Sequence, residues 1–180
     1  DAFYDAVDKK NDTSVYLKFN ITHPAVQLRR DAAFKMFFED VAKDYEDTIH
    51  MYDVSNEPSF LPYDKMYYRE YWLEYLVDMF DNDINKLNER YGTNYEKFSD
   101  CEMPWIEYTP LYQDYRDFAE NVMSTYLKNS VDTFKKYKPD GPVAIKQLIP
   151  VYIKEFYAPR IHSTNHEKQW NFFDYNGGEW

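Results

Sequence analysis

The chain has 180 residues, which is enough for one domain with a sizeable core, and its 20% aromatic content excludes a disordered polypeptide. The net charge of −11 argues against a nucleic-acid surface, which needs clustered Lys and Arg. A single cysteine, Cys101, excludes an internal disulfide and any zinc site built from several cysteines. No apolar run approaches membrane-spanning length. We therefore expect neither nucleic acid nor a membrane as partner.

The first third of the chain predicts a strand, a helix and a second strand. Residues 1–8 read as the tail of a helix, 14–20 as a strand, 25–46 as an amphipathic helix and 48–54 as a strand. Thr22 is a possible cap of that helix, and Pro24 is tolerated in its first turn. The apolar face of the helix is expected at Val26, Ala33, Phe37, Val41 and Tyr45, opposite Arg30, Lys35, Glu39 and Lys43. This order favours a parallel sheet with a right-handed crossover.

The remainder predicts three further helices and two further strands. The helices are expected over 64–80, from 83 to Gly92, and over 113–137, with an aromatic loop over 95–110. The strands are expected over 143–148 and at Trp170–Tyr175, the latter followed by a turn at 176–178. The spacing between the second and third strands is too long for one crossover helix. We therefore interpret residues 59–112 as an insertion that helps to shape a site.

The most informative stretch is Ser55-Asn56-Glu57-Pro58, where Pro58 stops a strand. In parallel α/β folds ligands bind at this end of the sheet. Asn56 is suited to hydrogen-bonding a sugar hydroxyl, and Glu57 to protonating a glycosidic oxygen. The alternative is that both are turn residues. His23 follows the first strand and would either bind sugar or cap a helix, and Trp105 would either stack on a sugar or pack within its loop.

Other polar residues are weaker candidates. Glu155 and Glu179 are possible second carboxyls, and Glu179 is disfavoured by its strand order. His162 and His166 have the spacing of a metal pair but no third ligand nearby, which favours surface histidines. No phosphate loop, dinucleotide fingerprint or nucleophile elbow is present. We expect no cofactor and no metal.

Several motifs in this order resemble glycoside hydrolase family 42, the β-galactosidases. They are Asn56-Glu57 after a strand, Trp72-Leu73 within YREYWLEYL, LNERYGT from Leu87 to Thr93, Pro104-Trp105, and DYRDF from Asp114 to Phe118. Family members share an asparagine-glutamate pair, a W-L helix, an LN-x-x-[WY]-G-T segment and a helix like D-x-x-R-F. This chain differs in having Pro58 after the glutamate and in lacking the family's cysteine cluster for zinc.

The resemblance implies a partial TIM (β/α)₈ barrel containing strands three to six. Because a complete barrel needs roughly 250 residues, residues 1–180 are expected to be a fragment of a single catalytic domain, completed by the rest of the enzyme or by another chain. Glu57 would be the general acid/base of a retaining β-glycosidase, and Asn56 would bind the sugar 2-hydroxyl. The nucleophile would lie beyond Trp180. The alternative is a non-catalytic carbohydrate-binding or structural protein derived from such a barrel.

Overall fold

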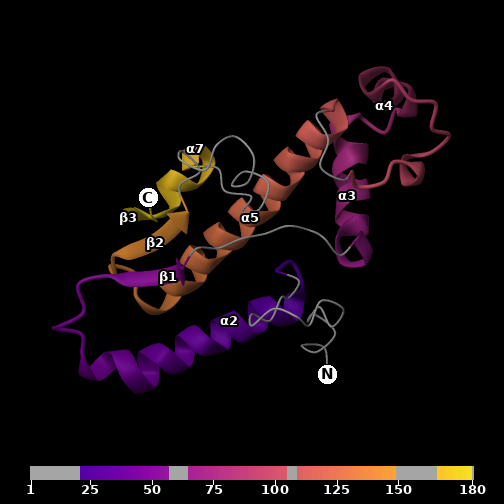
Figure 1. The fold of residues 1–180 in the computed structure, drawn as a ribbon. Helices are drawn as coiled ribbons and strands as arrows, with labels where there is room; N and C mark the ends of the chain where they lie inside the picture. Colours follow the sequence, from indigo (N-terminus) through magenta and orange to yellow (C-terminus); the bar gives the residue numbers. More distant parts are fainter. Residues whose placement is uncertain (1–20, 57–64, 105–108, 149–165, 180) are drawn as a thin grey trace, which may run out of the picture.

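A computed structural model describes residues 21–56, 65–104, 109–148 and 166–179. Its elements follow the order helix, strand, helical segment, long helix, strand, short helix and strand (Figure 1). The predicted helix over 1–8 and strand over 14–20 lie outside these residues. The elements are α2 (Pro24–Met36), η1 (Phe37–Val41), η2 (Ala42–Asp44), β1 (Tyr52–Asn56), α3 (Lys65–Met79), α4 (Ile84–Tyr91), η3 (Phe98–Asp100), α5 (Pro110–Tyr137), β2 (Val143–Leu148), α7 (His166–Gln169), η5 (Trp170–Phe172) and β3 (Tyr175–Glu179).

The three strands form one parallel sheet in the order β1-β2-β3. The predicted parallel sheet and the strand over 143–148 are therefore confirmed, whereas the strand predicted over 48–54 lies at Tyr52–Asn56. Helices cover one face of this sheet: Tyr52 of β1 packs its ring 5.1 Å from Phe134 of α5 and 5.5 Å from Phe38 of η1. Such a run of parallel strands with crossover helices on one face is an open arc of βα units.

The last strand is displaced from its predicted place at Trp170–Tyr175. That aromatic run instead forms the 3₁₀ helix η5, and β3 begins at Tyr175 and includes Gly177 and Gly178, so the turn predicted at 176–178 is wrong. The reason is tertiary: Phe173 is buried in the core between the two elements, and the carboxylate of Asp174 accepts a hydrogen bond from the Val143 amide at 2.8 Å. These contacts override the strand preference of the aromatic residues.

The helix predicted over 25–46 is confirmed in place but differs in form and in its buried face. It continues from α2 through the π turn η1 and the 3₁₀ turn η2. Phe37, Val41 and Tyr45, predicted to be apolar contacts, are 36%, 47% and 58% exposed. The face against α5 instead includes Arg30, Phe34 and Phe38, at a spacing of four residues, and of the predicted apolar positions Val26 is buried.

Arg30, predicted to face solvent, lies on this contact face. Its guanidinium donates to Ser130 Oγ at 2.7 Å and to the Tyr126 carbonyl at 3.2 Å, and it lies 5.2 Å from the centre of the Tyr126 ring. Burial lowers the pKa of Arg30. Arg30 can take this position because its long side chain packs its apolar part against α5 while its guanidinium forms hydrogen bonds.

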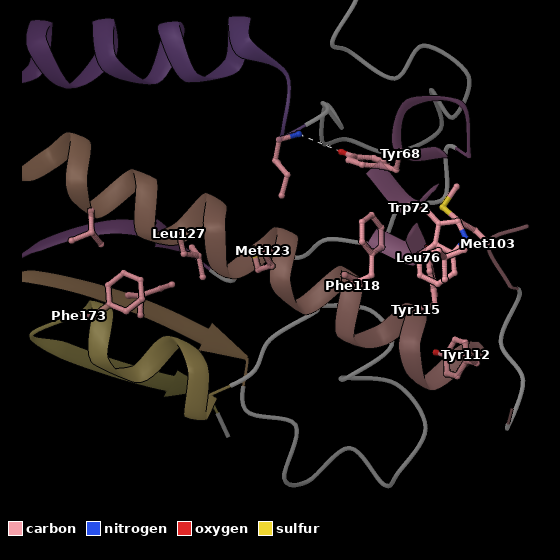
Figure 2. Packing of buried hydrophobic residues seen from close by; sticks show 14 of the residues in the cluster. Tyr68, Trp72, Leu76, Met103, Tyr112, Tyr115, Phe118, Met123, Leu127 and Phe173 are labelled. Carbon is pink, nitrogen blue, oxygen red and sulfur yellow. Dashed lines mark hydrogen bonds between the residues drawn. The ribbon is translucent and has the colours of Figure 1, made fainter. Parts of the chain in front are cut away.

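The main hydrophobic core runs along α5, which packs against the sheet at one end and against α3 at the other (Figures 1 and 2). Trp72 and Leu76 of α3 meet the first half of the helix, where the Trp72 ring lies 5.6 Å from Tyr115 and 5.4 Å from Phe118. The helix predicted over 64–80 is therefore confirmed, and its stripe is packing surface, although Tyr71 and Met79 remain exposed.

The α4 segment folds around its own polar side chains. Asp83 caps the helix by accepting from the Asn85 amide at 2.9 Å, and Gly92 ends it with φ of +66°, a conformation that favours glycine. Asn88 Oδ1 then accepts from Thr93 Oγ1 and from the Tyr95 amide, each at 2.8 Å. The segment Leu87–Thr93 is therefore the end of a helix that is stabilised by hydrogen bonds. Its asparagine, glycine and threonine have structural roles at that end.

Candidate functional site

The candidate site is the edge of the sheet where the three strands end. β1 ends at Asn56, β2 at Leu148 and β3 at Glu179. Asn56 is thus at the carboxyl end of its strand, as predicted. Glu57 follows it directly in the sequence and lies outside the described residues, as do Trp105, Glu155 and His162. Glu179 is the last residue of β3 and does not follow a strand and a turn as predicted.

An irregularity in β1 sets the register of Asn56. Tyr52 and Asp53 pair with Val143 and Ala144, whereas Asn56 pairs with Lys146, so β1 holds one extra residue between Asp53 and Asn56. Without this residue Ser55 would pair with Lys146. Such bulges recur beside active sites, where they redirect the residues that follow. Asp53 supports the bulge, since its Oδ1 accepts from the Ser55 amide at 3.0 Å.

The face of the sheet opposite the helices carries Ala144 and Lys146. Val143 and Ile145 belong to the hydrophobic core with α5. Because successive side chains of a strand point to opposite faces, Ala144 and Lys146 take the other face. The register places Lys146 in one row with Asn56 of β1 and Gly177 of β3. In the sequence Lys146 is marked only as a lysine two residues after a small alanine in an apolar strand.

His23 is the N-cap of α2. Its Nδ1 accepts a hydrogen bond from the Ala25 amide at 3.1 Å, and the side chain is partly buried. The cap is therefore His23 and not Thr22, while Pro24 takes its expected place in the first turn. The capping role considered for His23 is confirmed, and the bond uses Nδ1. A sugar contact of His23 stays a prediction.

The helices after β1 are anchored to this end of the molecule. The Ile21 amide, two residues before His23, donates to the Tyr68 hydroxyl of α3 at 3.3 Å (Figure 2). Trp72 of the same helix donates from Nε1 to the Cys101 carbonyl at 3.3 Å. Cys101 and Met103, which precede Trp105 in the sequence, are buried. The α3 helix thus holds both the loop of His23 and the segment that leads to Trp105.

No metal or redox centre is evident in the part of the chain that the structure describes. No three His, Cys, Asp or Glu side chains of these residues gather as metal ligands would. Burial raises the pKa of the Cys101 thiol to about 11, which favours the unreactive thiol over the thiolate. His166 opens the short helix α7. Within the described ranges, no helix has the length and apolar composition needed to cross a bilayer.

Comparison with known proteins relates this chain to one enzyme family and to several solved structures. The family model of glycoside hydrolase family 42, described as β-galactosidase, matches residues 5–175. Similar structures include a β-galactosidase from Rahnella sp. R3 (12% identity, TM-score 0.72), an exo-carrageenase of the same family from Bacteroides ovatus (19%, 0.69) and a β-galactosidase from Bacillus circulans sp. alkalophilus (18%, 0.64). No curated protein matched the chain.

These structures show the fold and the extent of the chain within it. Each alignment covers 91% of this chain, but only 23% of the Rahnella protein and 24% of each of the other two. The chain therefore spans about a quarter of the length of these relatives. Its parallel strands and their helices form part of a (β/α)₈ barrel, as predicted. Because the family model matches nearly the whole length of the chain, the chain belongs to glycoside hydrolase family 42, the β-galactosidases.

Proposed function

We propose that the protein containing this chain is a retaining β-glycosidase of the β-galactosidase type, with Glu57 as its general acid/base. The observation that carries this proposal is the position of Asn56 at the carboxyl end of a parallel barrel strand, in a chain of this family. Active sites of (β/α)₈ enzymes lie at that end. Glu57 is the next residue, and the relatives include two β-galactosidases.

In this mechanism two carboxyl groups about 5 Å apart act on opposite sides of the sugar. Protonated Glu57 donates to the leaving oxygen while a second carboxylate attacks the anomeric carbon and forms a glycosyl-enzyme. The Glu57 carboxylate then takes a proton from the water that hydrolyses it. The second carboxyl would come from the part of the enzyme beyond this quarter of its length. This chemistry needs no cofactor.

Asn56 would hold the sugar while Glu57 acts. An amide in this position donates to the 2-hydroxyl, a contact that strengthens as the transition state forms. The bulge in β1 supports this role, because it brings Asn56, instead of Ser55, level with Lys146. Trp105 would stack on a sugar face, and residues 59–112 would form the insertion that shapes the site within a single catalytic domain.

The test uses the intact enzyme with Glu57→Gln. Hydrolysis of natural galactosides should fall by about 10²- to 10⁴-fold, whereas aryl galactosides with good leaving groups should still form the glycosyl-enzyme, because they need little protonation. Added azide, which needs no general base, should then release a galactosyl azide of unchanged β configuration. Glu74→Gln, an exposed glutamate of α3, is the matched control.

Two results would contradict the assignment. Cleavage of natural galactosides by Glu57→Gln at the wild-type rate would exclude the acid/base role. An azide product of inverted configuration would mark Glu57 as the nucleophile. An intact wild-type protein that binds galactosides but cleaves none would instead favour a carbohydrate-binding barrel.

A further inference from the structure

The turn of residues 21–23 lies at the edge of the sheet where the candidate site is. It leads into α2, and α2, η1 and η2 lead into β1. Because such a crossover helix runs back along the sheet, opposite in direction to the strands, α2 begins at the carboxyl edge and ends at the amino edge (Figure 1). His23, which caps α2, is therefore held at the height of the strand ends.

Two side chains from different helices hold this turn by the backbone of Ile21. The amide of Ile21 donates to the hydroxyl of Tyr68 in α3 at 3.3 Å (Figure 2). The carbonyl of Ile21 accepts from Nε2 of Gln27 in α2 at 3.3 Å. Ile21 and Tyr68 are both buried, and a buried backbone group that loses its hydrogen bond is costly. Each of the two bonds therefore restricts the turn.

Gln27 connects the turn to the helix that covers the sheet. Its Oε1 accepts from Nη2 of Arg30, whose Nη1 donates to the Ser130 hydroxyl at 2.7 Å and to the Tyr126 carbonyl at 3.2 Å. A chain of hydrogen bonds therefore runs from α3 through the turn and α2 to α5. Connected side-chain hydrogen bonds of this kind make the groups that they join more rigid.

The bond between Tyr68 and Ile21 joins segments on the two sides of β1 in the sequence. The turn of residues 21–23 precedes this strand, whereas α3 follows its carboxyl end. Active sites of (β/α)₈ enzymes are built from the segments that follow different strands at this end. The relative position of such segments sets how well a substrate is held, because small displacements of its contacts cost binding and rate.

We infer that Tyr68 is a positioning residue for the sugar: together with Gln27, its hydroxyl holds the turn of residues 21–23 in the orientation that binds the substrate. This inference rests on the proposed glycosidase function and extends that site beyond Asn56 and Glu57. Tyr68 acts through the backbone of Ile21 and not on the reacting atoms. Its loss should therefore weaken sugar binding and leave the chemical step unchanged.

Tyr68→Phe in the intact enzyme tests this inference, because it removes only the hydroxyl. Hydrogen exchange of the peptide that contains residues 21–23 should accelerate about 3- to 10-fold, the scale of one neutral hydrogen bond. The Kd of methyl 1-thio-β-galactoside, which binds without turnover, should rise by a similar factor of about 3 to 10. The kcat for a nitrophenyl β-galactoside should change by less than about twofold.

Gln27→Glu tests the same turn from its other side. The carboxylate keeps an acceptor for Arg30 but has no donor for the Ile21 carbonyl. It should therefore accelerate exchange and raise the Kd as Tyr68→Phe does, without altering α3. Tyr71→Phe, which removes a hydroxyl from an exposed tyrosine of α3, is the matched control and should change neither quantity.

The outcomes separate the inference from the function beneath it. The inference is wrong if exchange accelerates while the Kd stays at the wild-type value, if exchange is unchanged, or if the Kd rises in Tyr68→Phe but not in Gln27→Glu. A kcat that falls together with the affinity would show a general structural role, and an intact wild type that binds no thiogalactoside would also overturn it. Binding that depends on Tyr68 and Gln27, without cleavage of any β-galactoside, would sustain the inference and refute the glycosidase proposal.

Discussion

Arg90 of α4 and Asp114 of α5 form a two-pronged ion pair, with Nε and Nη2 of the arginine each 2.5 Å from a carboxylate oxygen. Asp114 is fully buried, and its Oδ2 also accepts from the Tyr91 hydroxyl at 2.9 Å. Two motifs of the family, LNERYGT and DYRDF, therefore meet through these side chains. In this chain they serve as a scaffold that fixes α4 on the start of α5.

Arg90→Met should loosen α4 by leaving the Asp114 carboxylate buried without its cation. Asp114 is fully buried whereas Arg90 is 44% exposed, so the loss should cost about 3 kcal/mol, the scale for a buried charged group left unsatisfied. Hydrogen exchange of the α4 amides in the intact enzyme should accelerate by about 100-fold, since each 1.4 kcal/mol is a factor of ten. The control is Lys128→Met, which breaks an exposed ion pair between Lys128 and Asp132 within α5. It should change the exchange of the α4 amides little. Equal, small effects of both variants would show that Asp114 is satisfied without Arg90.

Asp53→Ala should reduce catalytic activity with little loss of stability. The exposed carboxylate of Asp53 holds the Ser55 amide, and its loss should let the β1 ladder relax so that Ser55, and not Asn56, pairs with Lys146. We expect kcat/KM to fall at least about tenfold, on the scale of a misplaced substrate contact. Asp53→Asn keeps a side-chain oxygen acceptor and should retain most activity. Comparable losses in both variants would point to the charge of Asp53 instead of the bulge.

The regular parts of this fold follow from local sequence. Gly92 and Asp83 mark the ends of α4, and the apolar run 143–148 marks β2, because caps and strand composition act within a few residues. The same locality predicts Asn56 at a strand end, because Pro58 forbids continuation two residues later.

The parts that sequence reasoning missed depend on contacts between distant residues. From its charge, Arg30 is expected at the surface. In the structure it packs against Ser130, which lies 100 positions away in the sequence. The strand predicted at Trp170–Tyr175 moves because Phe173 fills the core and Asp174 binds Val143. The presence of Asp53 two residues before Ser55 does not by itself predict the bulge in β1, since the bulge is defined by the register with β2. Lys146 became a site candidate only through that register.

His23 offers a test of capping against sugar binding. His23→Asn supplies another good N-cap, whereas His23→Ala removes the acceptor of the Ala25 amide and should cost about 1 kcal/mol. If His23 only caps α2, the melting temperature falls in the alanine variant alone, and KM for a galactoside is unchanged in the asparagine variant. A KM that rises equally in both, with stability kept by asparagine, would assign the ring a sugar contact.

The contact of Asp174 with β2 should make the stability of the protein depend on pH in the acidic range. The hydrogen bond from the Val143 amide, followed by the nearby ammonium of Lys135, lowers the pKa of Asp174 below its usual value. A carboxyl whose pKa is lower in the folded state stabilises that state above its unfolded pKa of about 3.9, and this contribution is lost as the pH falls through the lower folded pKa. The group is half exposed, so its contribution should be limited to about 1 kcal/mol.

Asp174→Asn therefore should lower the free energy of unfolding by about 1 kcal/mol near pH 7, measured by denaturant unfolding of the intact enzyme. The difference from wild type should stay constant down to about pH 5 and shrink below pH 4, where wild type itself loses the charge. Asp140→Asn, an exposed carboxyl in the turn before β2, is the matched control and should show no such trend. A difference that persists unchanged to pH 3 would mean that the shape of the side chain, and not its charge, joins Val143 to β3.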